Sequence, residues 1–130
     1  MIALDTTAII DFFRKDTNLK KVLDSLDDKF VTTVINYWEI QCGLNPKDSR
    51  FSEENEFYEI LFNDLITFDL DKESIKKASE IFWELANSGQ MIDDFDSIIA
   101  GSLITNGVTK LITRNKKHFQ RIPNIHVIDY

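Results

Sequence analysis

Short apolar segments alternate along this chain with longer amphipathic ones. The short segments are rich in β-branched and aromatic residues, and they predict strands at 1–4, 30–35, 65–68, 108–113 and 125–128. Residues 1–4 are apolar at almost every position, which is typical of a strand buried on both faces in the middle of a parallel sheet.

The longer segments have apolar residues at helical spacing. Helices are expected directly after Asp5, from Asp16 or Thr17, from Asn36 to a left-handed end at Gly43, from Ser52 as a cap, from Asp71 to Gly89, and from Asp96 to Asn106. Residues 114–119 predict a turn or a short helix. In the helix at 71–89, one side should carry Ile75, Ala78, Phe82, Leu85 and Ala86.

Strands that alternate with helices indicate the α/β fold class. We expect a three-layer α/β/α arrangement around a central, mainly parallel sheet of four to five strands. No repeat or linker interrupts the alternation, so a single domain over residues 1–130 is expected.

The composition favours a globular protein of a reducing compartment. Hydrophobic residues make up 43% of the chain, and its single cysteine, Cys42, cannot form an internal disulfide. No apolar run approaches the roughly 20 residues of a membrane span, and no basic segment precedes the first strand. We therefore expect a cytoplasmic location without membrane insertion.

Charge is unevenly distributed. A net charge of −7 argues against nucleic-acid binding by bulk electrostatics. Residues 97–128 nevertheless contain no acid and five basic residues: Lys110, Arg114, Lys116, Lys117 and Arg121. An acidic body with a basic end is the pattern expected of an acid-lined metal pocket beside a surface that contacts a polyanion. A solvated surface with a chance asymmetry would give the same pattern.

Three acids share a local context. Asp5 and Glu39 each follow a predicted strand, and Asp96 opens a predicted helix. Because the carboxyl ends of parallel strands lie along one edge of a sheet, these carboxylates could converge on one pocket. Clustered carboxylates repel unless they are protonated or hold a divalent cation, and oxygen ligands select Mg²⁺ or Mn²⁺ over zinc.

Each acid also has a structural interpretation that the sequence leaves open. Asp5, or a threonine after it, could cap the following helix. Glu39 could form a capping box with Asn36, since the Asn-x-x-Glu spacing fits. Asp96 and its acidic neighbours could interact with a helix dipole, a contribution of roughly 0.3–1 kcal/mol each.

Four motifs occur in order: Leu4-Asp5-Thr6-Thr7; Glu39 four residues before Gly43; Asp96-Ser97-Ile98-Ile99-Ala100; and Thr113-Arg114-Asn115-Lys116-Lys117-His118-Phe119 with Arg121-Ile122-Pro123. Together they resemble the PIN-domain ribonucleases, and most of all the VapC-type toxins of prokaryotic toxin–antitoxin pairs. Each motif is short, but the resemblance covers essentially the whole chain in order and length.

The resemblance implies a metal-dependent endoribonuclease. Asp5, Glu39 and Asp96 would be the metal ligands of its active site, with Mg²⁺ or Mn²⁺ as the cofactor. A metal ion held there would activate a water for hydrolysis of the RNA phosphodiester. Thr6 resembles the small hydroxyl residue that supports the first aspartate, and it is expected to lie against the substrate.

The last motif departs from the family pattern at the fourth acidic position. Asn115 and His118 stand where many relatives have a carboxylate. Asn115 could coordinate through its amide oxygen or hold a water, which makes it a catalytic candidate, whereas His118 is expected to contact the substrate. Asp94 is a further candidate for the missing charge.

The resemblance also implies partners. Arg114, Lys116 and Lys117 would hold the backbone of single-stranded or looped RNA, because a duplex fits poorly into a narrow acid pocket. A homodimer and a cognate antitoxin that blocks the active site are expected.

Three rival interpretations remain. A haloacid-dehalogenase type of phosphatase would need a second acid where Thr7 stands, and a receiver domain would need acids where Ala3 and Leu4 stand. The stronger rival is a catalytically degenerate PIN-like domain that only binds a partner or RNA. Cleavage assays with Mg²⁺, Mn²⁺ and EDTA would distinguish that form from an active enzyme.

Overall fold

Five short strands form one sheet in the computed structural model, which describes all 130 residues. They are β1 (Ile2–Leu4), β2 (Phe30–Thr33), β3 (Ile66–Phe68), β4 (Lys110–Ile112) and β5 (His126–Ile128). Their order is β3-β2-β1-β4-β5 and every neighbouring pair is parallel. The apolar β1 therefore lies in the centre of the sheet, as its sequence predicts.

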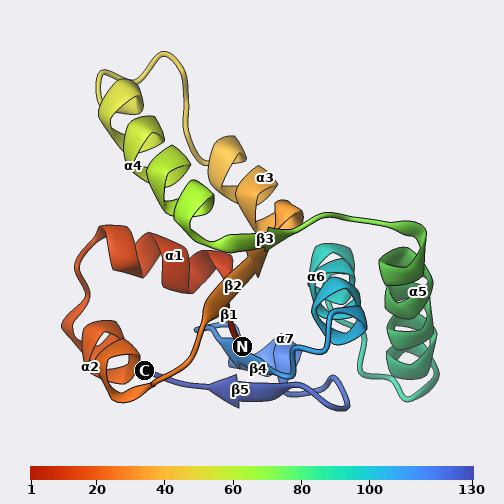
Figure 1. The fold of residues 1–130 in the computed structure, drawn as a ribbon. Coiled ribbons are helices and arrows are strands. Elements are labelled where there is room, and N and C mark those ends of the chain that lie inside the picture. The colour runs from red at the N-terminus through yellow and green to blue at the C-terminus, as the bar shows by residue number, and fades with distance from the viewer.

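Seven helices cover the sheet: α1 (Thr6–Phe13), α2 (Thr17–Ser25), α3 (Val34–Cys42), α4 (Phe51–Asp64), α5 (Lys72–Asn87), α6 (Asp94–Thr105) and α7 (Lys116–Phe119). In Figure 1, α1, α2 and α4 lie on one side of the sheet, and α5 and α6 lie on the other. The expected α/β/α arrangement is confirmed.

The strands supply alternate residues to two apolar cores. Ala3 and Leu111 belong to a cluster completed mainly by α5 and α6, whereas Ile2, Leu4 and Ile112 belong to one completed by α1 to α4. This alternation follows from the period of two along a strand, and it fixes the register of the sheet. The carboxyl ends of β1, β2 and β4 consequently lie side by side between the two helix layers.

The boundary between β2 and α3 differs from the prediction, which continued the strand to residue 35. Val34 already begins the helix, because Thr33 and Asn36 form a capping box: each side chain accepts a hydrogen bond from the other's backbone N–H, both at 3.3 Å. The expected box between Asn36 and Glu39 is therefore wrong. Gly43 has a φ of −78°, so the predicted left-handed end at this residue is also wrong.

Other helix ends mostly follow the sequence. Asp16 caps α2 and Asp71 caps α5, each by accepting a hydrogen bond from the first turn, at 2.9 Å and 2.8 Å. Gly89 and Gly107 follow α5 and α6 with left-handed φ values of 68° and 76°. Ser52 does not cap α4, because this helix begins one residue earlier.

The buried face of α5 is rotated from the predicted one. Ile75 is 44% exposed, whereas Ile81 is buried at 3%. Close packing against α6 sets this face, since Gly101 of α6 lies directly against the backbone of Ser74 and Ala78. None of the helices combines the length and hydrophobicity needed to cross a membrane.

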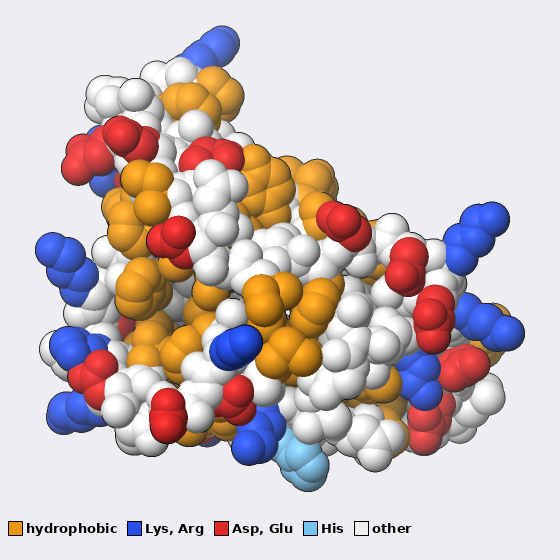
Figure 2. Space-filling model, viewed as in Figure 1, with side chains coloured by type: hydrophobic (Ala, Val, Ile, Leu, Met, Phe, Trp, Pro, Cys, Tyr) orange, Lys and Arg blue, Asp and Glu red, His pale blue; other side chains and the backbone are white.

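Charged side chains of both signs are scattered over the face shown in Figure 2, with hydrophobic side chains exposed between them over α1, α2 and α4. The exposed large hydrophobic residues of the whole surface include Phe12, Trp38, Trp83 and Phe95.

Candidate active site

Asp5 lies at the carboxyl end of the central strand and is only 4% exposed. Its Oδ1 accepts a hydrogen bond from Asn36 Nδ2 (3.1 Å), and its Oδ2 accepts one from the Thr113 hydroxyl (2.6 Å). Although Asp5 occupies the N-cap position of α1, its side chain makes no capping hydrogen bond. Side chains from the first turn of α3 and from the residue after β4 therefore hold this carboxylate, and the capping interpretation of Asp5 fails.

Glu39 lies one turn into α3 and is half-buried. Its Oε1 accepts a hydrogen bond from the Thr6 hydroxyl at 2.7 Å, and Asn36 Nδ2 donates to the same hydroxyl oxygen at 3.1 Å. Thr6 and Asn36 thus connect the carboxylates of Asp5 and Glu39 through one hydrogen-bond network. The Thr6 hydroxyl supports Glu39 directly, and it reaches the first aspartate only through Asn36.

Asp96 lies in the first turn of α6 and is 8% exposed. The N-cap of this helix is Asp93, whose side chain accepts from the backbone N–H of Phe95. Asp96 Oδ2 instead lies 2.9 Å from Asn115 Nδ2 and 2.7 Å from His118 Nδ1. An ionised carboxylate can only accept hydrogen bonds, so the Nδ1 atom of the histidine carries the proton in this arrangement.

The structure thus brings Asn115 and His118, the residues at the family's fourth acidic position, onto the same carboxylate oxygen. Asp94, the other candidate for the missing charge, does not reach this group. Its side chain is exposed and borders a depression between α5 and α6, together with Phe82 and Ser97.

The three carboxylates are destabilised as anions. Burial raises the pKa of Asp5, Glu39 and Asp96, and hydrogen bonds from Thr113, Thr6 and His118 oppose the rise. The negative charge of Asp96 also raises the pKa of Asp5, and both of these charges raise the pKa of Glu39. The charge of Asp96 therefore acts on both Asp5 and Glu39.

The donor set consists of hard carboxylate oxygens, with one amide and one imidazole beside them. This chemistry fits Mg²⁺ or Mn²⁺. As the side chains stand, no three His, Cys, Asp or Glu residues are grouped closely enough to hold one metal ion. Binding of one cation by all three carboxylates would therefore require these side chains to move closer together.

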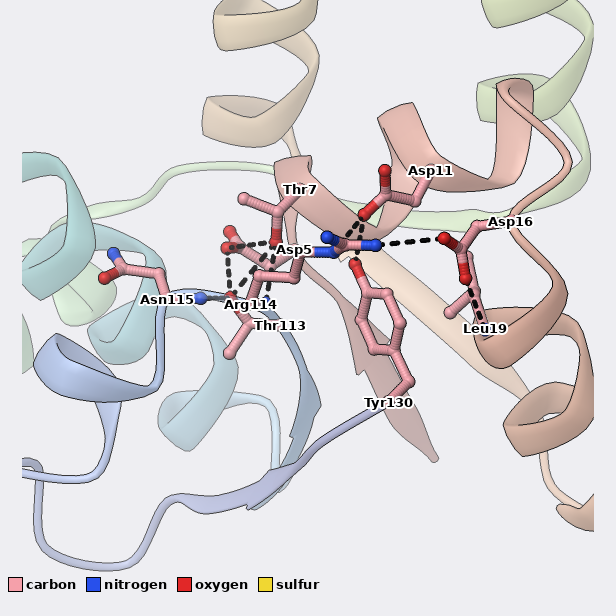
Figure 3. A network of polar contacts seen from close by, with 9 residues as sticks. All are labelled: Asp5, Thr7, Asp11, Asp16, Leu19, Thr113, Arg114, Asn115 and Tyr130. Atoms are coloured by element: carbon pink, nitrogen blue, oxygen red, sulfur yellow. Dashed lines mark hydrogen bonds and ion pairs between the residues drawn. The ribbon is translucent and has the colours of Figure 1, made fainter.

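Arg114 forms an ion-pair network that is linked to Asp5 through the Thr7 hydroxyl, which accepts a hydrogen bond from the Arg114 backbone N–H at 3.0 Å and donates one to Asp5 at 3.4 Å (Figure 3). Its Nε lies 2.6 Å from Asp11 Oδ2 and its Nη2 lies 3.0 Å from Asp16 Oδ2. The guanidinium also lies 5.1 Å from the centre of the Tyr130 ring, whose hydroxyl donates to Asp11 at 2.7 Å. Burial and the bond to Asp11 raise the pKa of Tyr130 to about 12.

The other basic residues of the last motif differ in their pairing. Lys116 pairs with Asp129, whereas Lys117 forms no ion pair and is exposed. Of the three cations expected to bind RNA, Lys117 alone is therefore free of an acidic partner in this structure.

Several residues of the site were not singled out from the sequence. Asn36 and Thr113, the donors to Asp5, are 1% and 0% exposed, and Asp11 is 8% exposed. One signal was present: Asn36 and Thr113 are polar residues at the ends of predicted strands, where a parallel sheet places ligand-binding groups. No local sequence pattern predicts the burial of Asp11, because its partners, Arg114 and Tyr130, lie near the other end of the chain.

Comparison with known proteins identifies the fold and the family. The PIN domain family matches residues 2–125. Ribonuclease VapC1 of Methanocaldococcus jannaschii is 30% identical over 123 residues, which cover 93% of this chain and 80% of that protein.

Solved structures with the same fold come from toxin–antitoxin systems. VapBC2 from Rickettsia felis, bound to a DNA fragment from its promoter, superposes with a TM-score of 0.85 at 24% identity and covers 100% of this chain and 99% of its own. DNA-bound VapBC from Salmonella typhimurium gives a TM-score of 0.84 at 24% identity, covering 99% and 98%. At these identities the superposition shows the shared fold alone, and the family follows from the sequence matches. The chain belongs to the PIN-domain family and, within it, to the VapC proteins of toxin–antitoxin systems.

Proposed function

We propose that this protein is a metal-dependent endoribonuclease that hydrolyses RNA phosphodiester bonds as the toxin of a toxin–antitoxin pair. The observation that supports the proposal is that one hydrogen-bond network joins Asp5 and Glu39, and that the negative charge of Asp96 raises the pKa of both carboxyls. Burial of negative charge is costly, and the only basic side chain paired with these three acids is His118, so the site is suited to a divalent cation.

The acids and the residues that hydrogen-bond to them have different proposed roles. Asp5, Glu39 and Asp96 would hold Mg²⁺ or Mn²⁺, which supplies charge neutralisation at the scissile phosphate and acidifies a water molecule. Thr6 orients the Glu39 carboxylate, and Asn115 orients that of Asp96.

Substrate contacts come from the same edge of the sheet. Lys117, which has no acidic partner, binds the RNA backbone, and His118 contacts the substrate from beside Asp96. Arg114 and Lys116 contribute to RNA binding through the positive potential of this segment, since each is held by acids in the free protein.

The partner assignment rests on the family. Proteins of the same fold are described as toxin–antitoxin complexes, including one from Klebsiella pneumoniae at a TM-score of 0.77. We infer a cognate antitoxin that covers the acidic site, a homodimer of this chain, and action on RNA in the cytoplasm.

The test is cleavage of a single-stranded RNA by the wild type and by Asp96→Asn, with Mg²⁺, Mn²⁺ or EDTA. The wild type should cut only with a metal ion, and Asp96→Asn should lose roughly 100-fold or more of the activity. Asp94→Asn removes the same charge from the same turn of α6 but outside the site, and it should cut like the wild type. The proposal would be contradicted if the wild type cut RNA without a metal ion or did not cut it at all. An equal loss of cleavage activity in Asp96→Asn and Asp94→Asn would also contradict it.

A further inference from the structure

A pocket of about 390 Å³ opens beside Glu39, between α1, α3 and α4. Its walls include the apolar side chains of Ile10, Phe13, Ile40 and Leu44. This volume lies within the usual range of small-ligand sites, about 300–1,000 Å³. Glu39 belongs both to the lining of this pocket and to the candidate active site, so the pocket borders that site.

Tyr58 places a polar group in this apolar pocket. The residue is 4% exposed, but its hydroxyl oxygen remains accessible to solvent and makes no hydrogen bond within the protein. The hydroxyl is therefore available to a molecule that enters the pocket.

Arg14 adds an unpaired cation to the lining. It forms no ion pair, in contrast to Arg114, which is held by two acids. Burial and the charge of Glu54 raise the pKa of Tyr58, and Arg14 opposes that rise, so both charged side chains lie near the phenol. The pocket thus combines an aromatic and apolar wall, a free hydroxyl and a free guanidinium with the carboxylates of Glu39 and Glu54, and with Arg50, which pairs with Asp48.

We propose that this pocket binds one unpaired nucleotide of the RNA, adjacent to the scissile phosphate. The base lies against the Phe13 side of the pocket and hydrogen-bonds to the Tyr58 hydroxyl, and Arg14 binds the neighbouring backbone phosphate. Single-stranded RNA is commonly recognised in this way, by bases that leave the stack and pack on aromatic side chains beside a cationic group. The inference rests on the proposed ribonuclease function, because it assigns the pocket to the same substrate.

The first test measures binding of a fluorescent single-stranded RNA by anisotropy, in an Asp96→Asn background that leaves the RNA uncut. Arg14→Ala should weaken binding roughly 10-fold, and it should reduce the slope of log K against log salt by about 0.7, the value for one phosphate of a single strand. Arg14→Lys should recover part of the loss. Lys76→Ala removes an equal charge from the exposed surface of α5, and it should bind like the parent protein.

The second test measures binding of the base and uses the active enzyme, without the Asp96→Asn substitution. Tyr58→Phe removes only the hydroxyl, which has no partner in the protein, so the fold and its melting temperature should be retained. This variant should raise KM roughly 5- to 10-fold with little change in kcat. Single abasic nucleotides scanned along a cleavable RNA should raise KM at one position next to the cut, and that position should lose its effect in Tyr58→Phe.

The outcomes separate this inference from the proposed function. If the wild type cuts RNA but Arg14→Ala and Tyr58→Phe retain wild-type Kd and KM, the pocket assignment is wrong while the ribonuclease assignment stands. A fall in kcat at constant KM would also overturn the assignment, because it would indicate an indirect effect on the carboxylates. If the wild type cuts no RNA, the proposed function fails first.

Discussion

At the scale of single residues, the site is built from acids whose hydrogen-bond donors are held by the fold. Asn36 is fixed by its capping box with Thr33 before it donates to Asp5. Thr113 is fixed between the Asp5 carboxylate and the backbone N–H of Asn115, at 2.6 Å and 2.9 Å. Such donors orient a carboxylate in the way that outer-shell groups orient metal ligands.

Thr113→Val tests this arrangement, because valine has nearly the same shape and lacks the hydroxyl. The side chain is completely buried, so the Asp5 oxygen and the Asn115 N–H would both lose a partner. We expect the free energy of unfolding to fall by about 1–3 kcal/mol, measured by urea denaturation. Thr109→Val, at an exposed position, should change it by less than about 0.5 kcal/mol. If the two substitutions changed the free energy of unfolding equally, the buried hydroxyl would contribute no more to stability than the exposed one.

The sequence predicts the acids of this site more reliably than their supports. Asp5, Glu39 and Asp96 stand out because charged residues at the ends of strands and starts of helices have a limited set of functions. Asn36 was considered as the N-cap of a helix in which Glu39 would complete a capping box, since the Asn-x-x-Glu spacing fits that motif. Its actual partners, Thr33 and the distant Asp5, depend on where β2 ends, and that boundary is decided by tertiary packing.

At the scale of secondary-structure elements, the closest helix contact lies between α5 and α6. An ideal Cβ on Gly101 would lie 2.6 Å from the carbonyl oxygen of Ser74 and 2.7 Å from the backbone N of Ala78. Gly101→Ala should therefore force the helices apart and cost about 1–3 kcal/mol in unfolding free energy, although alanine favours helix by about 1 kcal/mol. Ser79→Ala on the exposed side of α5 is the matched control. If Gly101→Ala instead raised the unfolding free energy, α5 would be able to move away from α6 at little cost.

The Arg114 network links elements that are far apart in the sequence, since it joins the residue after β4 to α1 and to the start of α2. Arg114→Ala would leave the buried Asp11 carboxylate with only the Tyr130 hydroxyl. We expect a loss of about 1–3 kcal/mol in a denaturant titration, and only partial recovery by Arg114→Lys, which lacks the planar fork. The loss should shrink in an Asp11→Asn background, where the buried charge beside Arg114 is gone and only the ion pair with Asp16 remains. An undiminished loss there would assign the effect to the Asp16 pair or to packing on Tyr130 instead.

The elements themselves were largely predictable. Alternation of short apolar and longer amphipathic segments was sufficient to predict a parallel sheet between helix layers, because few topologies can bury such segments. The errors lie where packing overrides local preference: Ile75 was expected in the core of α5, yet Gly101 sets the helix face so that Ile81 is buried. Ser52 is of a residue type that commonly caps helices, but α4 begins one residue before it.

At the scale of the whole molecule, the sheet order explains why distant residues meet. β1 lies between β2 and β4, so groups that follow these three strands share one edge: Asp5, Asn36 and Thr113. α6 then brings Asp96 toward them from the opposite helix layer. The resulting site concentrates negative charge in a buried position, which the free protein tolerates only at a cost in stability.

That cost predicts a specific response to divalent cations. A ligand that binds only the folded state stabilises it by about 2.7 kcal/mol when its concentration is 100 times Kd, so Mg²⁺ or Mn²⁺ should raise the Tm of the wild type by roughly 5–10 °C. In EDTA, Asp96→Asn should have the same Tm as the wild type or a higher one, because one repelling charge is gone. The rise in Tm on adding the metal ion should be smaller for this variant than for the wild type. Asp94→Asn, whose side chain lies outside the site, should keep the full rise. Calorimetric scans with and without metal measure both effects. A wild-type Tm that does not respond to either ion, or an equal rise in Asp96→Asn, would mean that the three acids do not form a common cation site.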